Sequence, residues 1–171
     1  MAAQGPATRS PVAQKALVVF YSRTGTTRRI AEALAAALGC DCEAIVAAER
    51  YAGFFGVTRA SIEAMWQRPA RIAAAKLDPA AYDLVILGTP VWFWSVTSPM
   101  RAYLAANKNK LPQVAFFCTL GGRGSDSAFA QMQAAAGKPP RATAAFTTAD
   151  AMTARFQPRL AAFVQALAAT S

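Results

Sequence analysis

Short continuous runs of apolar residues recur along this chain, and stretches with helical spacing separate them. Such runs are typical of strands that a parallel sheet covers on both faces, because both sides of the strand are then buried. The pattern predicts five strands, at residues 16–21, 42–46, 84–87, 114–118 and 143–146.

The stretches between these runs place apolar side chains three and four residues apart, as an amphipathic helix does. Gly39 and Gly137 stand where helices commonly end, and Ser98 followed by Pro99 predicts an N-cap and first helical turn. Residues 53–66 are aromatic-rich and indicate a helical or irregular excursion. The last helix is indicated by the apolar set Leu160, Phe163, Val164 and Leu167.

Alternating strands and helices predict an α/β fold, in which right-handed crossovers place helices on both faces of a parallel sheet. A chain of 171 residues is long enough for one substantial core. We expect residues 1–14 to be a disordered tail and residues 15–171 to be the folded domain. In such sheets, ligands bind beyond the carboxyl ends of the strands.

The turn after the first strand is rich in hydroxyl groups and leads directly into a helix. Its residues are Ser22, Arg23, Thr24, Gly25, Thr26 and Thr27. The first turn of a helix has amides without intrahelical partners and a partial positive charge, so a phosphate suits this position. The alternative is an ordinary N-cap, for which serine and threonine are also common. Neither a G-x-x-x-x-G-K-[ST] loop nor a G-x-G-x-x-G after the first strand is present.

Composition narrows the chemistry further. The chain has no histidine, which excludes His-based catalysis and histidine metal sites. The three cysteines, Cys40, Cys42 and Cys118, lack a zinc spacing and are interpreted as reduced thiols. No segment has the continuous apolar length of a membrane span, and we expect a cytoplasmic protein. Any redox or group-transfer chemistry would therefore come from a bound cofactor.

Two more loops of unusual composition follow the third and fourth predicted strands, and all three loops should meet at one edge of the sheet. The first of these two covers residues 88–95 and contains Thr89, Pro90, Val91, Trp92, Phe93 and Trp94. Exposed aromatic side chains on a loop favour a ligand or partner that covers them. The other contains Thr119, Leu120, Gly121 and Gly122, which leave the backbone open. A phosphate site beside aromatic and glycine-rich loops suits a planar phosphorylated ring such as flavin mononucleotide (FMN).

On these motifs the sequence resembles the flavodoxin family, and specifically its small one-domain branch, over residues 16–169. The hydroxyl turn is similar to the family's S/T-x-T-G-x-T phosphate loop. The resemblance implies a doubly wound five-stranded parallel sheet of order 2-1-3-4-5, the order that is described for flavodoxin itself, with FMN at the switch point.

The resemblance also implies roles for the site residues. Ser22, Thr24, Thr26 and Thr27 would hold the phosphate, Gly25 would keep the turn open, and Arg23 would add charge. Either Trp92 or Trp94 would stack on the flavin, and backbone groups from residues 89–93 and 119–122 would meet its polar edge. An alternative for Phe93 and one tryptophan is packing against residues 53–66.

With no catalytic side chain assigned, the flavin would carry the chemistry, and the protein would tune it. We expect an FMN-dependent electron carrier, with a single-domain NAD(P)H:quinone-type oxidoreductase as the alternative. Its partners would be a redox protein or a small acceptor such as a quinone. The formal charge of +9 is unlike the acidic flavodoxins and indicates peripheral contact with acidic surfaces. A nucleic-acid-binding protein is a more distant alternative, because the basic residues form no recognised motif.

Overall fold

The structure, a computed structural model, describes residues 14–47 and 70–169. The expected tail, apart from Gln14, and the expected excursion at 53–66 lie outside this part of the chain. The strands are β1 (Ala16–Phe20), β2 (Asp41–Ala44), β3 (Leu84–Trp92), β4 (Ser95–Val96), β5 (Gln113–Leu120) and β6 (Thr143–Thr147). The α-helices are α1 (Thr26–Leu38), α3 (Ser98–Asn107), α4 (Ser125–Ala136), α5 (Thr148–Ala151) and α6 (Gln157–Ala169). Short 3₁₀ helices are η1 (Pro79–Ala81), η2 (Lys108–Lys110) and η3 (Ala154–Phe156).

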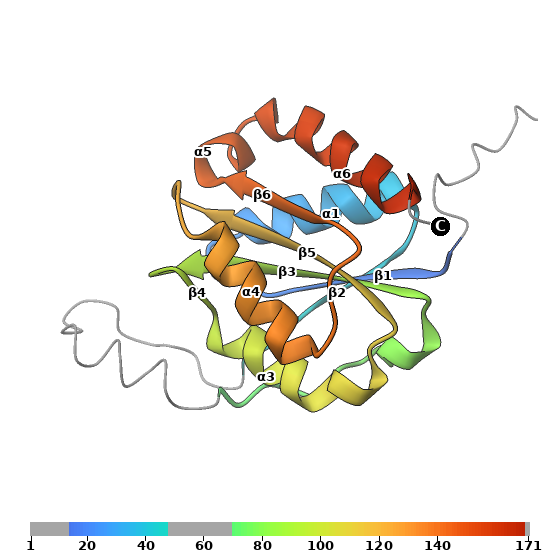
Figure 1. Cartoon of the computed structure of the whole chain (residues 1–171). Helices are drawn as coiled ribbons and strands as arrows, with labels where there is room; N and C mark the ends of the chain where they lie inside the picture. The colour runs from blue at the N-terminus through green and yellow to red at the C-terminus, as the bar shows by residue number, and fades with distance from the viewer. Residues whose placement is uncertain (1–13, 48–69, 170–171) are drawn as a thin grey trace, which may run out of the picture.

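Five strands pair in parallel in the order β2-β1-β3-β5-β6, and β4 pairs antiparallel with the end of β3. Counted along the parallel strands alone, this is the predicted order 2-1-3-4-5. Helices α1 and α6 cover one face of the sheet, and α3 and α4 cover the other (Figure 1). The predicted α/β fold with helices on both faces is confirmed.

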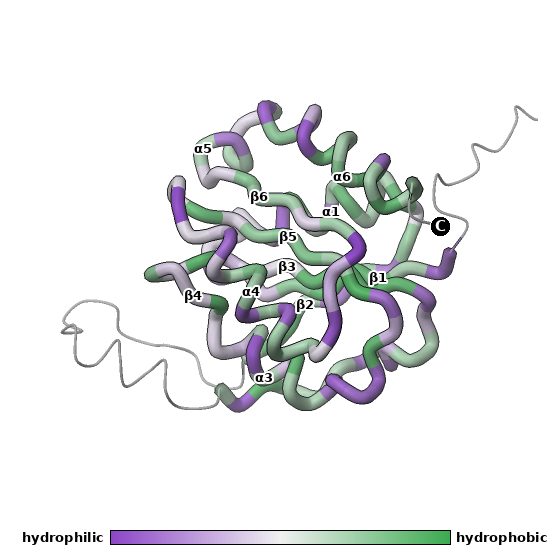
Figure 2. Tube along the Cα trace, viewed as in Figure 1, coloured by the Kyte–Doolittle hydropathy of each residue, from purple (hydrophilic) through white to green (hydrophobic). Residues whose placement is uncertain are grey.

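Each face of the sheet has its own apolar core, because successive side chains of a strand point to opposite faces. Val18 and Phe20 of β1 pack under α1 and α6, whereas Leu17 and Val19 face α3 and α4. This two-sided burial explains why the strands read as unbroken apolar runs, which Figure 2 shows at the centre of the molecule.

The predicted loop at residues 88–95 is wrong, because β3 continues to Trp92 and returns through β4. Gly88 and Pro90 are both accommodated within this longer strand. The pairing of β1 with β3 ends at Gly88, so Pro90 has a strand neighbour only on the β5 side. A proline lacks the amide donor of a ladder and is tolerated where a strand is paired on one side. Gly88 is required by close packing, since an added Cβ would lie 2.0 Å from Cζ of Phe117.

Smaller differences occur at element ends. Strand β2 covers Asp41–Ala44, so the predicted strand at 42–46 begins and ends too late. Thr97, and not Ser98, is the N-cap residue of α3. The helix ends at Gly39 and Gly137 are confirmed, and both glycines are left-handed. Within residues 14–47 and 70–169, no helix is both long enough and apolar enough to cross a membrane.

Candidate functional site

The hydroxyl turn connects the carboxyl end of β1 to the first turn of α1. Gly25 is the N-cap of α1 with a φ of 93°, and no described side chain caps the helix. Its amide donates to Ser22 Oγ at 3.1 Å, and the hydroxyls of Thr24 and Thr26 lie 3.3 Å apart. Thr24 is exposed, and Ser22 and Thr26 are half-buried. The first amides of α1 therefore sit among accessible hydroxyl groups.

This end of α1 is strongly positive. Its first turn holds Arg28 and Arg29 and no acidic residue, and both charges add to the positive end of the helix dipole. Arg29 donates to the carbonyl of Met152 at 3.2 Å, which fixes one of these charges beside the turn. A Cβ added to Gly25 would meet no heavy atom within 4 Å, so the loop is open above the glycine. Hydroxyls, amides and positive charge around an open loop suit an anion such as phosphate.

The aromatic segment forms a hairpin and not the expected loop. Trp92 pairs with Ser95 across a two-residue turn, in which Phe93 and Trp94 have φ values of 50° and 59°. Phe93 is 70% exposed and Trp94 is 60% exposed. Trp92 is half-buried, with its ring edge-to-face against Tyr21 at a centroid distance of 6.3 Å. The guanidinium carbon of Arg23 lies 5.8 Å from the Trp92 centroid, within cation–π range.

The three predicted site segments meet at the carboxyl edge of the sheet, as the sequence predicts. Arg23 and Trp92 join the hydroxyl turn to the hairpin. The hydroxyls of Thr27 and Thr119, both buried, lie 2.7 Å apart and join the turn to β5. A Cβ added to Gly124 would lie 3.0 Å from Cδ1 of Trp94, so the hairpin also contacts the start of α4.

The glycine-rich segment divides into paired and open parts. Thr119 and Leu120, expected in a loop, are the last residues of β5 and pair with β6. Gly121 and Gly122 are exposed, and an added Cβ at either would meet nothing within 4 Å. Accessible backbone at this side of the site therefore begins at Gly121.

Two further residues that hold the site together were not anticipated from the sequence. Gln131 of α4 bonds to Trp94, Ser95 and Val96 of the hairpin. Thr97 places its hydroxyl 3.0 Å from that of Thr89, and both are fully buried. The sequence gives no signal for either residue, because both bond to the hairpin and the sequence predicts a loop there.

Cys40 and Cys42 lie at the amino end of β2, and Cys118 is buried in β5 next to Thr119. All three are free thiols. Burial raises the pKa of Cys40 to about 11 and that of Cys118 to about 12, so both are protonated at neutral pH. A protonated thiol is a poor nucleophile, which agrees with the interpretation of these cysteines as reduced thiols.

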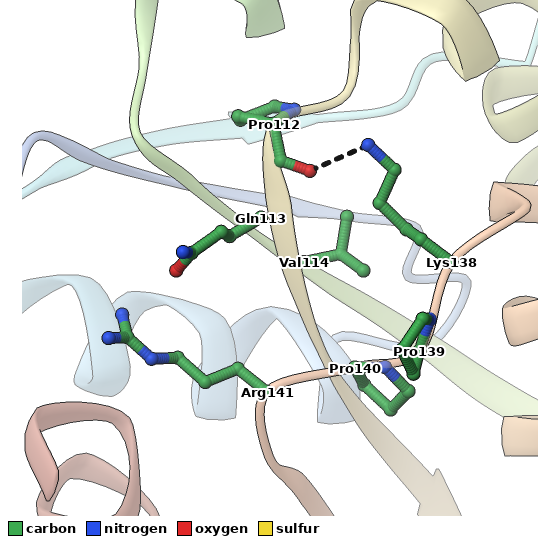
Figure 3. Close-up of a pocket in the computed structure, with 7 residues that line it drawn as sticks. All are labelled: Pro112, Gln113, Val114, Lys138, Pro139, Pro140 and Arg141. Atoms are coloured by element: carbon green, nitrogen blue, oxygen red, sulfur yellow. Dashed lines mark hydrogen bonds between the residues drawn. The ribbon is translucent and has the colours of Figure 1, made fainter. Parts of the chain in front are cut away.

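A separate pocket of about 440 Å³ lies where β5 begins, at the edge opposite the hydroxyl turn (Figure 3). It is lined by Pro112, Gln113, Val114, Lys138, Pro139, Pro140 and Arg141. Its two cations have structural partners: Lys138 donates to the carbonyls of Leu111 and Pro112, and Arg141 donates to Gln14 Oε1 at 2.6 Å. None of the predicted site residues lines this pocket.

Comparison with known sequences and structures agrees with this arrangement. The sequence model of the family described as Flavodoxin matches residues 15–140. The chain belongs to the flavodoxin family. The matched region contains the hydroxyl turn, the hairpin and Gly121–Gly122, so the resemblance seen in the motifs is confirmed. No curated protein matches the sequence.

Several solved flavoproteins share the fold at low identity. A flavoprotein from Lactobacillus acidophilus NCFM in complex with FMN is 24% identical, with a TM-score of 0.65 over 78% of this chain and 93% of that chain. A protein described as a flavoprotein, from Bacteroides eggerthii DSM 20697, is 23% identical, with a TM-score of 0.67 over 85% and 98%. A flavodoxin, WrbA-like protein from Agrobacterium tumefaciens is 17% identical, with a TM-score of 0.53 over 93% and 100%.

Proposed function

We propose that this protein binds FMN at the carboxyl edge of the sheet and carries electrons through it. The observation that carries the proposal is the start of α1, where a glycine N-cap and accessible hydroxyls form an open loop next to Trp92 of the hairpin, and where the first helical turn carries two arginines and no acidic residue. A phosphate and a planar ring can then bind side by side. The FMN complex of the Lactobacillus acidophilus flavoprotein, which shares this fold, supports the same ligand.

The phosphate would be held by the hydroxyls of Ser22, Thr24 and Thr26 and by the first amides of α1. Hydrogen bonds to a charged acceptor contribute roughly 1.5–3 kcal/mol each. Thr27 would act differently, because its hydroxyl is buried against Thr119 and its main contribution is to fix the start of the helix. Arg23, which is exposed, would add positive charge near the phosphate.

The ring would lie against the hairpin and the open backbone that begins at Gly121. Trp92 contacts Tyr21 and Arg23 beside the hydroxyl turn, and Trp94 contacts Gly124 at the start of α4, so the two indoles of the hairpin lie next to the two neighbouring loops. When bound, the flavin would supply one-electron and two-electron transfer. The chain itself would position the ring, limit the access of water and set the charge around it.

The absence of a G-x-G-x-x-G after the first strand favours a carrier over an enzyme that binds its own nicotinamide. The excess of basic residues favours an acidic redox partner, because charge complementarity speeds the encounter of two proteins. A quinone-bearing anionic membrane surface is a second acceptor with the same charge requirement.

The binding claim is tested with Thr26→Ala, which removes one hydroxyl from the proposed cradle. We expect FMN to bind about 10- to 150-fold more weakly, as the loss of one charge-assisted bond of roughly 1.5–3 kcal/mol requires. Thr143→Ala is the matched control, since Thr143 is an exposed threonine at the start of β6, at the opposite edge. Equal losses in the two variants, or none in either, would remove the hydroxyl turn from the phosphate site.

The carrier claim is tested by NADPH oxidation in the presence of a soluble quinone. A carrier that depends on a separate reductase should give no more turnover than the same concentration of free FMN. Sustained turnover that saturates with NADPH would instead identify the quinone oxidoreductase.

A further inference from the structure

The tip of the β3–β4 hairpin has an unusual backbone. Phe93 and Trp94 are consecutive residues with positive φ, as a type I′ turn requires at its two central positions. Asparagine and glycine normally occupy those positions, and a bulky residue with positive φ is strained. Such strain persists only where the surrounding structure holds the backbone in place.

Gln131 of α4 supplies that support. Its Oε1 accepts hydrogen bonds from Ser95 Oγ at 2.9 Å and from the Val96 amide at 3.2 Å. Its Nε2 donates to the carbonyl of Trp94 at 3.1 Å and to Ser127 Oγ at 3.1 Å. One side-chain amide thus bonds to three consecutive hairpin residues. A glutamate at this position could accept the two hydrogen bonds but could not donate the other two, and a hydrocarbon side chain could make none of the four.

The start of α4 fits the same part of the hairpin. A Cβ added to Gly124 would lie 3.1 Å from the Trp94 Cα, so only glycine allows this close approach without displacement. The tip of the hairpin is therefore fixed at two points, by close packing against Gly124, the N-cap of α4, and by hydrogen bonds to Gln131. The hairpin carries both tryptophans that flank the candidate flavin site.

We propose that Gln131 is a positioning residue of the flavin site. It lies on α4 and acts through the hairpin, whose strained turn it fixes so that Trp92 and Trp94 keep one arrangement toward the ring. This role rests on the proposed function, because the positions of the two tryptophans matter for binding only if a flavin occupies the site. It predicts that loss of the Gln131 amide changes the flavin environment more than the fold.

Three variants test the role. Gln131→Leu removes all four bonds, and Gln131→Glu keeps the two acceptor bonds and loses the two donor bonds. Gln133→Leu makes the same change as the first at an exposed glutamine on the same helix and serves as the control. Hydrogen exchange of residues 91–96 without FMN, the FMN dissociation constant and the visible flavin spectrum are measured for each, with thermal unfolding as the check on folding.

We expect Gln131→Leu to speed exchange at residues 91–96, to weaken FMN binding about tenfold and to shift the flavin absorbance band. Gln131→Glu should give smaller changes of the same kind, and Gln133→Leu none. If Gln131→Leu binds FMN with wild-type affinity and spectrum, the positioning role is wrong. If the wild type itself does not bind FMN, the proposed function fails, and this role fails with it.

Discussion

The buried pair of Thr27 and Thr119 gives a sharp test of how the site is assembled. The two hydroxyls lie 2.7 Å apart and connect residues 92 positions apart in the sequence, from the start of α1 to the end of β5. Their side chains are 1% and 3% exposed, so water does not readily replace a lost partner. Thr27→Val keeps the branched shape of the side chain and leaves the Thr119 hydroxyl unsatisfied.

Leaving one buried hydroxyl without its partner costs about 1–3 kcal/mol. Thr27→Val and Thr119→Val should each destabilise the protein by that amount and lower its melting temperature by about 2–12 °C. The double variant removes both polar groups, and its free energy of unfolding should lie within about 1 kcal/mol of the wild type. The single changes are therefore expected to be strongly non-additive.

The assay is urea unfolding of the four proteins without FMN, followed by tryptophan fluorescence and circular dichroism. Coincident transitions would justify a two-state treatment. Additive losses, with the double variant as unstable as the two singles combined, would refute the hydrogen bond between the two threonines. Wild-type stability of both single variants would show that these hydroxyls are satisfied by other groups.

Three other expectations concern packing, pH and charge. Gly88→Ala should lower the free energy of unfolding, measured in urea, by about 1–3 kcal/mol, because the added Cβ would overlap the ring of Phe117. An unchanged urea midpoint would mean that the ring moves aside freely. Burial raises the pKa of Cys118 from 9.0 to about 12, so its contribution to stability is intact below pH 9 and is lost as the pH rises toward 12. At pH 10.5 the wild type should therefore lose about 2 kcal/mol more of its free energy of unfolding, relative to neutral pH, than Cys118→Ala does. Equal pH dependence of stability in the two proteins would contradict the raised pKa of Cys118. Arg23→Gln should make the flavin reduction potential more negative at low salt, because the negative charge added on reduction then lacks a nearby cation, and the difference should shrink at high salt. A redox titration that gives the same potential for both proteins would show that Arg23 lies too far from the ring.

The parallel strands of this fold could be predicted from the sequence, because a strand that is buried on both faces appears as a continuous apolar run. The runs at 84–87 and 114–118 are strands for that reason, and helical spacing likewise located α6. The order of strands came from resemblance to the flavodoxin family, and the structure confirms it.

The hairpin could not be predicted, because its determinants lie elsewhere in the chain. The apolar run at 84–87 predicts a strand that ends in a loop, and the turn at Phe93 and Trp94 has none of the usual hairpin residues. Gln131 and Gly124 stabilise it from α4, about 30 residues further along the chain. The contact of Thr27 with Thr119 could not be predicted for a similar reason, since the two residues are brought together only once β5 is placed beside β3.

The central claim is that the start of α1 binds the phosphate of FMN, and a comparison of FMN with riboflavin tests it most directly. The two ligands share the ring and differ in the phosphate. Titration of the ligand-free protein with each, followed by quenching of flavin fluorescence, gives both dissociation constants. Two or more charge-assisted bonds to the phosphate predict that FMN binds at least about 100-fold more tightly. Equal affinity for the two ligands would contradict the account, because the hydroxyl turn would then make no contribution to flavin binding.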